Sequence, residues 1–188
     1  GLGDGLEDDV FGVRMLAESL PELIVVSSCS KNFGLYCERV GAVTVICQTD
    51  QQLSVVSSQL AAIARGIYSM PPDHGAAIVR EILQDPDLRH SWDLELTEMR
   101  ERINSLRASL AQRLRTAGVE TDFSFIEREK GMFSFLGINV EQVQKLIADY
   151  SIYLVNSSRI NVAGINDSNI DYLVDSLTGV LSNTRSGP

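Results

Sequence analysis

Basic residues and long hydrophobic runs are scarce in this chain. Its 188 residues include 16 lysines and arginines against 25 aspartates and glutamates, which gives a formal net charge of −9. A nucleic-acid-binding surface needs a basic stripe, so this balance argues against one. No apolar run approaches the length of a membrane span, and no stretch has the pattern of a signal peptide. These absences predict a cytoplasmic protein without a nucleic-acid or membrane partner.

Cysteine and histidine are also few. The three cysteines, Cys29, Cys37 and Cys47, are odd in number and lie in or beside apolar runs. Reduced thiols in a protein core fit this arrangement better than a disulfide framework does. Only His74 and His90 could join the cysteines around zinc, and neither has the spacing of a ligand pair. We therefore expect neither a disulfide nor a metal site.

Residues 27–41 lie between two short apolar runs, residues 23–26 and 43–46. Both runs are rich in β-branched residues and predict buried strands. Lys31 would then lie between two buried strands, where an ammonium is costly to desolvate and the free amine is favoured. A free amine is what a Schiff base with a carbonyl cofactor needs.

Residues 28–41 read Ser-x-x-Lys-Asn-Phe-Gly-Leu-Tyr-x-Glu-Arg-Val-Gly. This order closely resembles the pyridoxal-phosphate lysine segment of the aspartate and aromatic aminotransferases. The resemblance implies that Lys31 forms the Schiff base with pyridoxal 5'-phosphate and later moves a proton at the substrate's α-carbon. It also implies that Ser28 and Arg39 hold the cofactor phosphate, which suits a hydroxyl and a guanidinium. The alternative is that Lys31 is an exposed loop lysine and Arg39 a surface partner of Glu38.

Two further arginines lie in segments that resemble the same family. Arg65 begins a segment similar to Arg-x-x-Tyr-Ser-Asn-Pro-Pro-x-His-Gly, with Met70 in place of the asparagine. The resemblance implies that this arginine reaches across a homodimer interface to bind the side-chain carboxylate of a dicarboxylic substrate. The alternative for Arg65 is a helix C-terminal cation stabilised by the helix dipole. His74, in the same segment, is expected to start a helix rather than to take part in catalysis.

The second of these arginines is Arg159. Residues 157–164 resemble the family's Ser-Gly-Arg-(Ile/Val)-Asn-Val-Ala-Gly segment, with Ser158 in place of the glycine. The resemblance implies that Arg159 binds the α-carboxylate of every substrate, through two parallel donors that lysine cannot copy. The alternative is a structural arginine at the start of a strand. Phe133 resembles a family phenylalanine near the substrate and fits a plain hydrophobic core equally well.

Hydrophobic periodicity predicts a mixture of helices and short strands. The longest predicted helix, residues 86–117, begins at a proline and is followed by a glycine, as these residues favour. Trp92 and Met99 are assigned to core packing rather than to ligand contacts, and the charged stretch of residues 100–115 to a solvated helix face. The other predicted helices are residues 8–19, 51–68, 75–83, 140–150 and 167–181, and the predicted strands are residues 23–26, 43–46, 123–127, 131–135, 152–155 and 159–162.

These elements predict an α/β fold. Residues 1–85 are expected to be the end of a large cofactor-binding domain, residues 86–118 a long bridging helix and residues 119–188 a small α/β domain. The glycines of residues 1–9 could suggest a dinucleotide-binding loop, but no strand precedes them. They resemble instead the family segment that follows a Tyr-Gln-Gly turn. The polar tail, residues 182–188, is expected to fray.

The resemblance covers nearly the whole chain, whereas the chain corresponds to about the C-terminal half of the family. The family's aspartate that pairs with the pyridine nitrogen, and its tyrosine that bonds the phenolic oxygen, would precede Gly1. The resemblance implies transamination between an amino acid, foremost L-aspartate, and a 2-oxo acid such as 2-oxoglutarate or oxaloacetate. Aromatic amino acids stay open as substrates, because aromatic-type relatives carry the same motifs. A second hypothesis is a fragment that binds no cofactor and has no activity.

Overall fold

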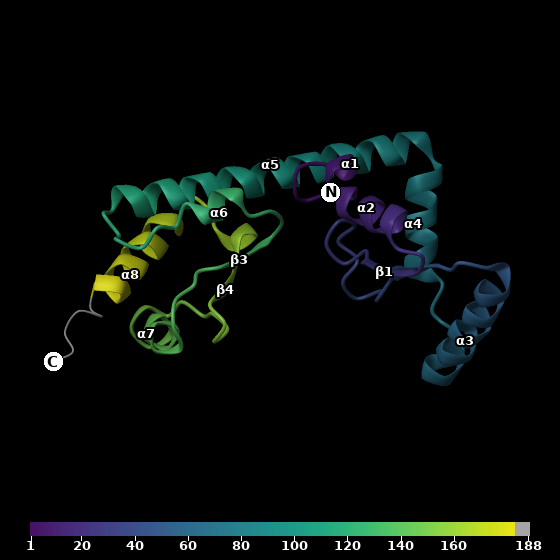
Figure 1. The fold of residues 1–188 in the computed structure, drawn as a ribbon. Coiled ribbons are helices and arrows are strands. Elements are labelled where there is room, and N and C mark those ends of the chain that lie inside the picture. Colours follow the sequence, from purple (N-terminus) through teal and green to yellow (C-terminus); the bar gives the residue numbers. More distant parts are fainter. Residues whose placement is uncertain (183–188) are drawn as a thin grey trace. The chain divides into compact units, whose positions relative to one another are not determined.

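The computed structural model describes residues 1–182, which form two compact units (Figure 1). Unit 1 comprises Gly1 and residues 5–97, and unit 2 comprises residues 2–4 and the chain from Glu98 onward. The elements of unit 1 are α1 (Leu6–Asp9), α2 (Phe11–Ser19), β1 (Leu23–Ser28), β2 (Gly41–Ile46), α3 (Asp50–Tyr68), α4 (His74–Gln84) and the first part of α5 (Pro86–Thr116). Those of unit 2 are the rest of α5, α6 (Phe125–Arg128), β3 (Phe133–Phe135), α7 (Val140–Tyr150), β4 (Arg159–Asn161), a 3-10 turn (Val162–Gly164) and α8 (Ile170–Ser182).

This mixture of helices and strands confirms the predicted α/β class. The two units divide inside α5, between Thr97 and Glu98. The predicted domains, residues 1–85, 86–118 and 119–188, stay a prediction. Most of the predicted tail lies outside the described residues. Among residues 1–182, no helix is both long and apolar enough to cross a membrane.

The lysine-containing stretch lies between β1 and β2, which form an antiparallel pair with Ser28 opposite Gly41. The expectation that both strands are buried is wrong. Ile24 and Val26 are 68% and 72% exposed, so no described element of unit 1 covers the face that carries them. A two-stranded sheet has no neighbouring strands to complete a layer, and burial then depends on whatever else packs on its faces.

The long helix predicted over residues 86–117 is confirmed as α5. The carboxylate of Asp85 accepts hydrogen bonds from the backbone N–H groups of Asp87 and Leu88, at 2.9 and 3.0 Å. These bonds satisfy donors that the first turn of a helix leaves unpaired. The helix ends just before Gly118, whose φ of 74° lies in the left-handed region that favours glycine.

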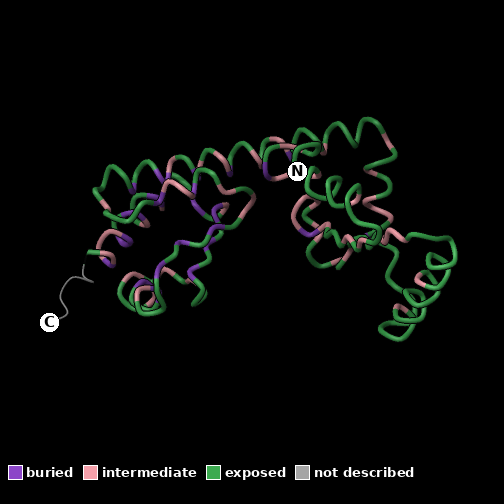
Figure 2. The backbone as a smooth tube through the Cα atoms, in the orientation of Figure 1, coloured by how far each residue is buried: buried purple, intermediate pink, exposed green. Residues whose placement is uncertain are grey.

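The large hydrophobic core of the described chain lies in unit 2, where the buried segments concentrate (Figure 2). The antiparallel pair of β3 and β4 contributes to it together with the apolar faces of α5, α7 and α8. α7 matches its predicted bounds and begins with a capping box between Asn139 and Gln142. The buried core residues are Ile103, Leu110, Ala111, Leu114, Phe123, Ile126, Leu136, Ile138, Val143, Leu146, Ile160, Val162, Ile165, Ile170, Val174, Leu177 and Val180.

Two predicted strands are wrong. Within residues 123–127, the helical turn α6 begins at Phe125, because the Asp122 carboxylate accepts both the backbone N–H and the hydroxyl of Ser124, at 2.8 and 2.9 Å. Such a side-chain bond to the second residue onward turns the chain. Residues 152–155 belong to no strand of the described chain. A strand forms only where a neighbouring strand accepts and donates its backbone hydrogen bonds, and the apolar pattern of a segment does not show whether such a neighbour exists.

Arg107 contradicts the expectation that residues 100–115 present a solvated charged face. Its side chain is only 1% exposed, and its guanidinium bonds backbone carbonyls of unit 2. Desolvation by this burial lowers the pKa of Arg107, and the nearby Glu129 carboxylate opposes the shift.

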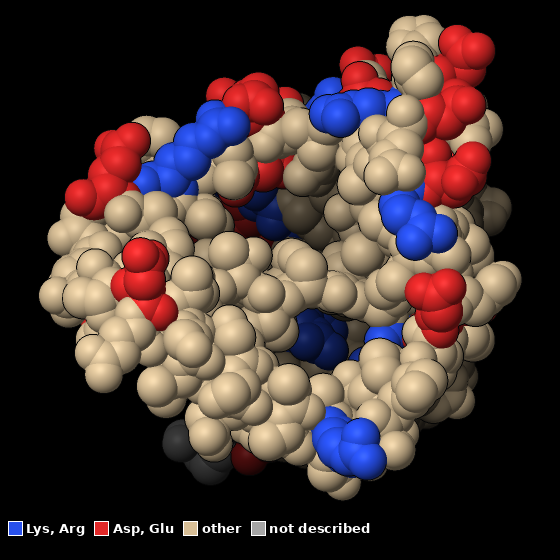
Figure 3. Space-filling view, turned by 90° about the vertical axis from the view of Figure 1, so that its right-hand side faces the viewer, with Lys and Arg blue, Asp and Glu red and all other residues tan. Residues whose placement is uncertain are grey.

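On the face that Figure 3 shows, acidic and basic side chains lie interspersed around a broad area of uncharged residues.

All three cysteines are free thiols. Cys29 and Cys47 are half-buried, whereas Cys37 is exposed, so the expectation of core thiols is wrong for Cys37. The exposure follows from its place in the loop between the two strands rather than in a strand. Burial raises the pKa of the Cys29 thiol.

Candidate active site

Lys31 lies in residues 28–41, the lysine turn, which starts with a tight bend where β1 ends. The carbonyl of Cys29 accepts the backbone N–H groups of Phe33 and Leu35, both at 3.3 Å, and these bonds close the turn. Gly34 has a φ of 67°, which a residue with a side chain adopts only at a cost. The Lys31 side chain is half-buried, so it is neither enclosed between buried strands nor an openly exposed loop lysine.

The strand register brings Ser28 and Arg39 to the same end of the β1–β2 pair as Lys31. Ser28 lies opposite Gly41, which follows Arg39 by two residues. A side chain at Gly41 would place its Cβ 2.3 Å from the carbonyl oxygen of Ser27, so only glycine permits this close approach of the strands. Three of the five predicted site residues therefore share one connected segment of unit 1.

Tyr36 contacts both Lys31 and Arg39. Its hydroxyl accepts a short hydrogen bond from Lys31 Nζ, and its ring centroid lies 4.0 Å from that nitrogen. Its backbone carbonyl accepts a bond from Arg39 Nη1 at 3.5 Å. Glu38, the alternative partner of Arg39, instead lies 3.6 Å from Nδ1 of His74. Tyr36 stands inside the motif of residues 28–41, but the order of residues alone does not indicate its contacts with Lys31 and Arg39.

The donors of this turn suit a ligand that carries both a carbonyl group and a phosphate. The Ser28 hydroxyl donates to Ser30 Oγ at 3.0 Å and accepts the Ser30 backbone N–H at 3.2 Å, which orients it. The Arg39 guanidinium is exposed. A hydroxyl and a guanidinium are donors that bind phosphate oxygens, and a primary amine can attack a carbonyl carbon.

Trp92 of α5 packs against the lysine turn. Its ring stacks on Phe33 with the centroids 4.6 Å apart, and its Nε1 donates to the carbonyl of Asn32 at 2.7 Å. Asn32 is the residue next to Lys31, so the indole fixes the backbone beside the amine. The buried Oδ1 of Asn32 has no hydrogen-bond donor among residues 1–182. Periodicity predicted that Trp92 packs inside the protein, whereas the structure shows that its partners are Phe33 and Asn32.

Arg65 lies in the last turn of α3 and is exposed. A cation at this place is stabilised by the helix dipole, which agrees with the structural alternative. Nothing among the described residues of unit 1 joins Arg65 to the lysine turn, so its substrate role stays a prediction. His74 is the first residue of α4, as expected.

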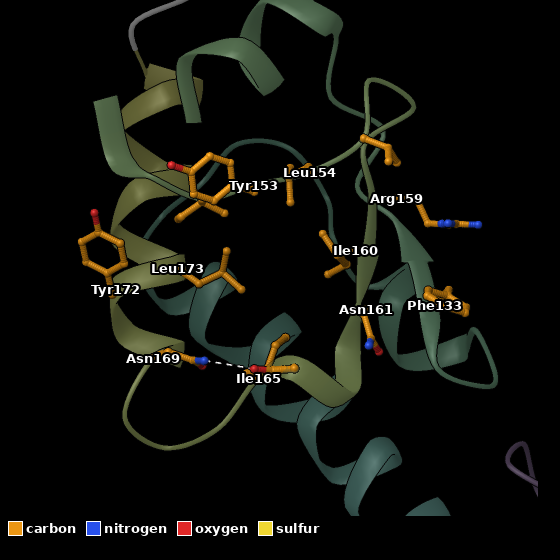
Figure 4. Close-up of a pocket in the computed structure, with 13 residues that line it drawn as sticks. Phe133, Tyr153, Leu154, Arg159, Ile160, Asn161, Ile165, Asn169, Tyr172 and Leu173 are labelled. Atoms are coloured by element: carbon orange, nitrogen blue, oxygen red, sulfur yellow. Dashed lines mark hydrogen bonds between the residues drawn. The ribbon is translucent and has the colours of Figure 1, made fainter. Parts of the chain in front are cut away.

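Arg159 begins β4 in unit 2. Its guanidinium carbon lies 4.7 Å from the centroid of the Phe133 ring. Phe133, Arg159 and Ile160 all line a cavity of about 430 Å³. In Figure 4, Ile160 points into it toward Leu173, whereas the side chain of Arg159 extends to the other side of β4. Successive side chains of a strand alternate between its faces, which explains this arrangement. The exposed guanidinium on the outer face is in a position to bind a carboxylate in two-point fashion.

Ser158 adopts the left-handed backbone that a glycine would favour, with a φ of 62°. Its buried hydroxyl accepts the backbone N–H of Gly137 at 3.1 Å. The departure from the family motif therefore keeps the turn before Arg159 and adds a bond to it.

Comparisons with known proteins agree with these features. Residues 2–177 match the family described as Aminotransferase class I and II. The chain is 49% identical to the aspartate aminotransferase of Haemophilus influenzae over 96% of this chain and 46% of that protein. It is 45% identical to an aromatic-amino-acid aminotransferase of Pseudomonas aeruginosa over 96% of this chain and 45% of that protein. A crystal structure of the aromatic-amino-acid aminotransferase from Burkholderia pseudomallei, covalently bound to pyridoxal phosphate, matches with a TM-score of 0.89 and 44% identity over 96% of this chain and 45% of that one.

The fold and the lysine turn thus define an α/β protein of the aminotransferase type. The chain belongs to the aminotransferase class I and II family. It spans about half the length of the curated relatives it matches.

Proposed function

We propose that this chain takes part in transamination between an amino acid and a 2-oxo acid, with pyridoxal 5'-phosphate as its cofactor. The lysine turn carries this proposal, because it joins the amine of Lys31 to a hydroxyl and a guanidinium, Ser28 and Arg39, on one segment. The chemistry of these donors matches an aldehyde with a phosphate. Support also comes from a solved relative that is covalently bound to pyridoxal phosphate.

Each residue of the turn has a distinct part in the proposed reaction. Lys31 holds the cofactor through Nζ and then moves a proton at the substrate's α-carbon. Ser28 and Arg39 bind the phosphate, and Tyr36 holds Nζ of Lys31 through its hydroxyl. When bound, the cofactor supplies the electron sink that the chemistry needs.

Two arginines would select the substrate. Arg159 binds the α-carboxylate that all amino acid and 2-oxo acid substrates share. Arg65 of a neighbouring copy binds the second carboxylate of a dicarboxylic substrate, so the active form is a homodimer with shared sites. L-Aspartate is the foremost amino acid substrate, with 2-oxoglutarate or oxaloacetate as the partner acid. Similarity to both aspartate and aromatic-amino-acid aminotransferases keeps an aromatic substrate as the alternative.

The chain itself offers a matched test of the cofactor site. Its three lysines are Lys31, Lys130 and Lys145. After incubation with pyridoxal phosphate and reduction with borohydride, peptide mapping should find the added mass on Lys31. Lys130, which is paired with Asp4, and Lys145 serve as internal controls. Equal labelling of the three lysines, or labelling of Lys130 or Lys145 alone, would contradict the assignment.

A second candidate is a chain that folds or assembles without binding the cofactor. The exposed apolar residues Ile24 and Val26 of β1, the strand that leads into the lysine turn, favour it for the 188-residue chain taken alone. This candidate predicts no label on Lys31 and no transaminase turnover. Turnover in the usual range of enzymes, about 1 to 1,000 per second, would exclude it.

A further inference from the structure

Arg107 is a buried cation to which the proposed function gives no part. It lies on the part of α5 that belongs to unit 2, and its described partners also belong to unit 2. Burying a guanidinium is costly unless nearly all of its donors are satisfied, so its placement needs a physical reason.

The guanidinium of Arg107 donates hydrogen bonds to several groups of residues 126–134. Nη2 donates to the carbonyl of Phe133 at 2.5 Å and to that of Gly131 at 2.7 Å. Nε donates to the same Gly131 carbonyl at 3.2 Å. The remaining contacts of Nη1 and Nη2 are the Ile126 carbonyl at 3.1 Å, the Ser134 hydroxyl at 3.4 Å, the Glu129 carboxylate at 3.5 Å and the Lys130 carbonyl at 3.5 Å.

These contacts stabilise the buried charge of Arg107 and also hold the backbone of residues 126–134 in one conformation. A guanidinium has five donors in a rigid planar fork, whereas an ammonium has three on a flexible stem. Most of the partners are backbone carbonyls, so the fork holds the path of the chain from α6 into β3. The Ser134 hydroxyl also donates a short bond to the Glu129 carboxylate, which closes the network.

Through Phe133, this network contacts Arg159, the arginine proposed to bind the substrate's α-carboxylate. Phe133, whose carbonyl Arg107 holds, places its ring against the guanidinium of Arg159 at 4.7 Å. The pairing of β3 with β4 sets Phe133 opposite Asn161 and Phe135 opposite Arg159. A shift of the Phe133 backbone would therefore move both the ring and the strand that carries Arg159.

We propose that Arg107 is a positioning residue: it holds Phe133 in place, and Phe133 in turn orients Arg159 toward the substrate's α-carboxylate. Only the last step, the binding of a carboxylate by Arg159, rests on the proposed function. The orientation of Arg159 by Arg107 is a property of unit 2 and can be tested without cofactor or substrate.

The first test measures the geometry by NMR on the chain described here. Protons of the Arg159 side chain that lie over the Phe133 ring are shifted upfield by its ring current, and Phe133→Leu sets the value without this shift. In Arg107→Lys the upfield shift should fall to less than about half, because the ammonium cannot hold the same carbonyls. Arg113→Lys is the matched control, since Arg113 lies on the same helix and pairs with Asp171 of α8.

Signals from α7 and α8 report whether each variant keeps the fold of unit 2. Should Arg107→Lys fail to fold, Arg107→Gln is measured in sucrose, which strengthens effective burial. The same loss of the upfield shift is expected there. A folded variant of Arg107 that retains the wild-type shift overturns the positioning role.

The second test uses the active enzyme. Arg107→Lys should raise KM for the amino acid and for the 2-oxo acid by about tenfold. The reason is that a displacement of about 1 Å of a binding group, here the guanidinium of Arg159, is enough for such a loss. The cofactor dissociation constant of Arg107→Lys should match that of the wild type. The control Arg113→Lys should have the wild-type KM for both substrates. A fall in kcat with unchanged KM for both substrates would mean that Arg107 only stabilises the fold.

The two proposals fail in different ways. If Arg159→Lys leaves KM unchanged, the carboxylate role of Arg159 fails, and the NMR shift alone decides whether Arg107 orients it. If Arg159→Lys raises KM but Arg107→Lys changes neither KM nor the upfield shift, the proposed function stands and the positioning role is wrong.

Discussion

The indole N–H of Trp92 donates to the carbonyl of Asn32 at 2.7 Å across 60 residues of sequence. Together with the stack on Phe33, this bond ties the start of α5 to the residue beside Lys31. The two contacts can be separated, because phenylalanine can stack but cannot donate a hydrogen bond.

Trp92→Phe should therefore lower the free energy of unfolding of unit 1 by about 1 kcal/mol, the value of one hydrogen bond. Trp92→Leu should cost about 1 kcal/mol more, since it also removes the aromatic stack. Urea unfolding followed by circular dichroism measures both changes. Leu94→Ala, at an exposed position on the same helix, is the control and should change the free energy much less. Equal costs for the two Trp92 variants would show that the stack contributes nothing.

Arg39→Ala should weaken binding of pyridoxal phosphate by about 10- to 100-fold, because a charge-assisted bond to phosphate is worth about 1.5–3 kcal/mol. Equilibrium titration of the cofactor measures this loss. Arg39→Lys keeps the positive charge and should recover part of the affinity. Glu38→Gln is the control, because the described contact of Glu38 is with His74. An unchanged dissociation constant in Arg39→Ala would remove this arginine from the phosphate site.

Ser158 tests the balance between backbone strain and a buried hydrogen bond. Ser158→Ala loses the bond to the Gly137 N–H and keeps the left-handed φ of 62°, so unit 2 should lose about 1–2 kcal/mol. Ser158→Gly loses the same bond but removes a strain of about 1–2 kcal/mol, so its stability should stay close to that of the wild type. Denaturant unfolding compares the two variants. A glycine variant as unstable as the alanine variant would contradict this account.

Cys37 should react with iodoacetamide several-fold faster than Cys29 in the folded chain. The thiolate is the reactive form, and burial raises the pKa of the Cys29 thiol, so a smaller fraction is ionised at a given pH. Cys37 is exposed. Peptide mapping of a time course measures both rates, and the difference should vanish in urea. A faster reaction at Cys29 would mean that the strand end opens readily.

Arg65→Ala should reduce kcat/KM for aspartate by about 10- to 100-fold and leave an aromatic substrate within a few-fold, because only aspartate then carries a carboxylate without its charged partner. Arg159→Ala should impair both substrates. Steady-state kinetics with the two amino acids measures the contrast. Equal losses for both substrates in Arg65→Ala would assign Arg65 a structural role.

Mixing subunits tests whether Arg65 acts in the neighbouring copy. A heterodimer of a Lys31→Ala subunit and an Arg65→Ala subunit would have one site with both defects and one intact site. Aspartate activity should reappear on mixing two nearly inactive homodimers. If mixed dimers form and no activity returns, Arg65 serves the site of its own subunit or no substrate.

Local patterns in the sequence account for much of the fold. The spacing of apolar residues, Pro86 and Gly118 determined the long helix, and the Asn139 cap determined the start of α7. These signals work because helix formation depends on bonds between near neighbours in the chain. The predicted strand at residues 123–127 failed for the same kind of reason, since the Asp122 side chain formed a local turn that periodicity does not register.

The sequence by itself determined the candidate chemistry, because the order of residues around Lys31 and Arg159 is read directly from the chain. Only the tertiary structure decided which side chains hold those residues in place. Trp92 reaches Asn32 from a distant helix, and Arg107, one of several arginines on α5, is buried under residues 126–134. Such contacts depend on how distant segments pack together, and the periodicity of a single helix contains no information about them.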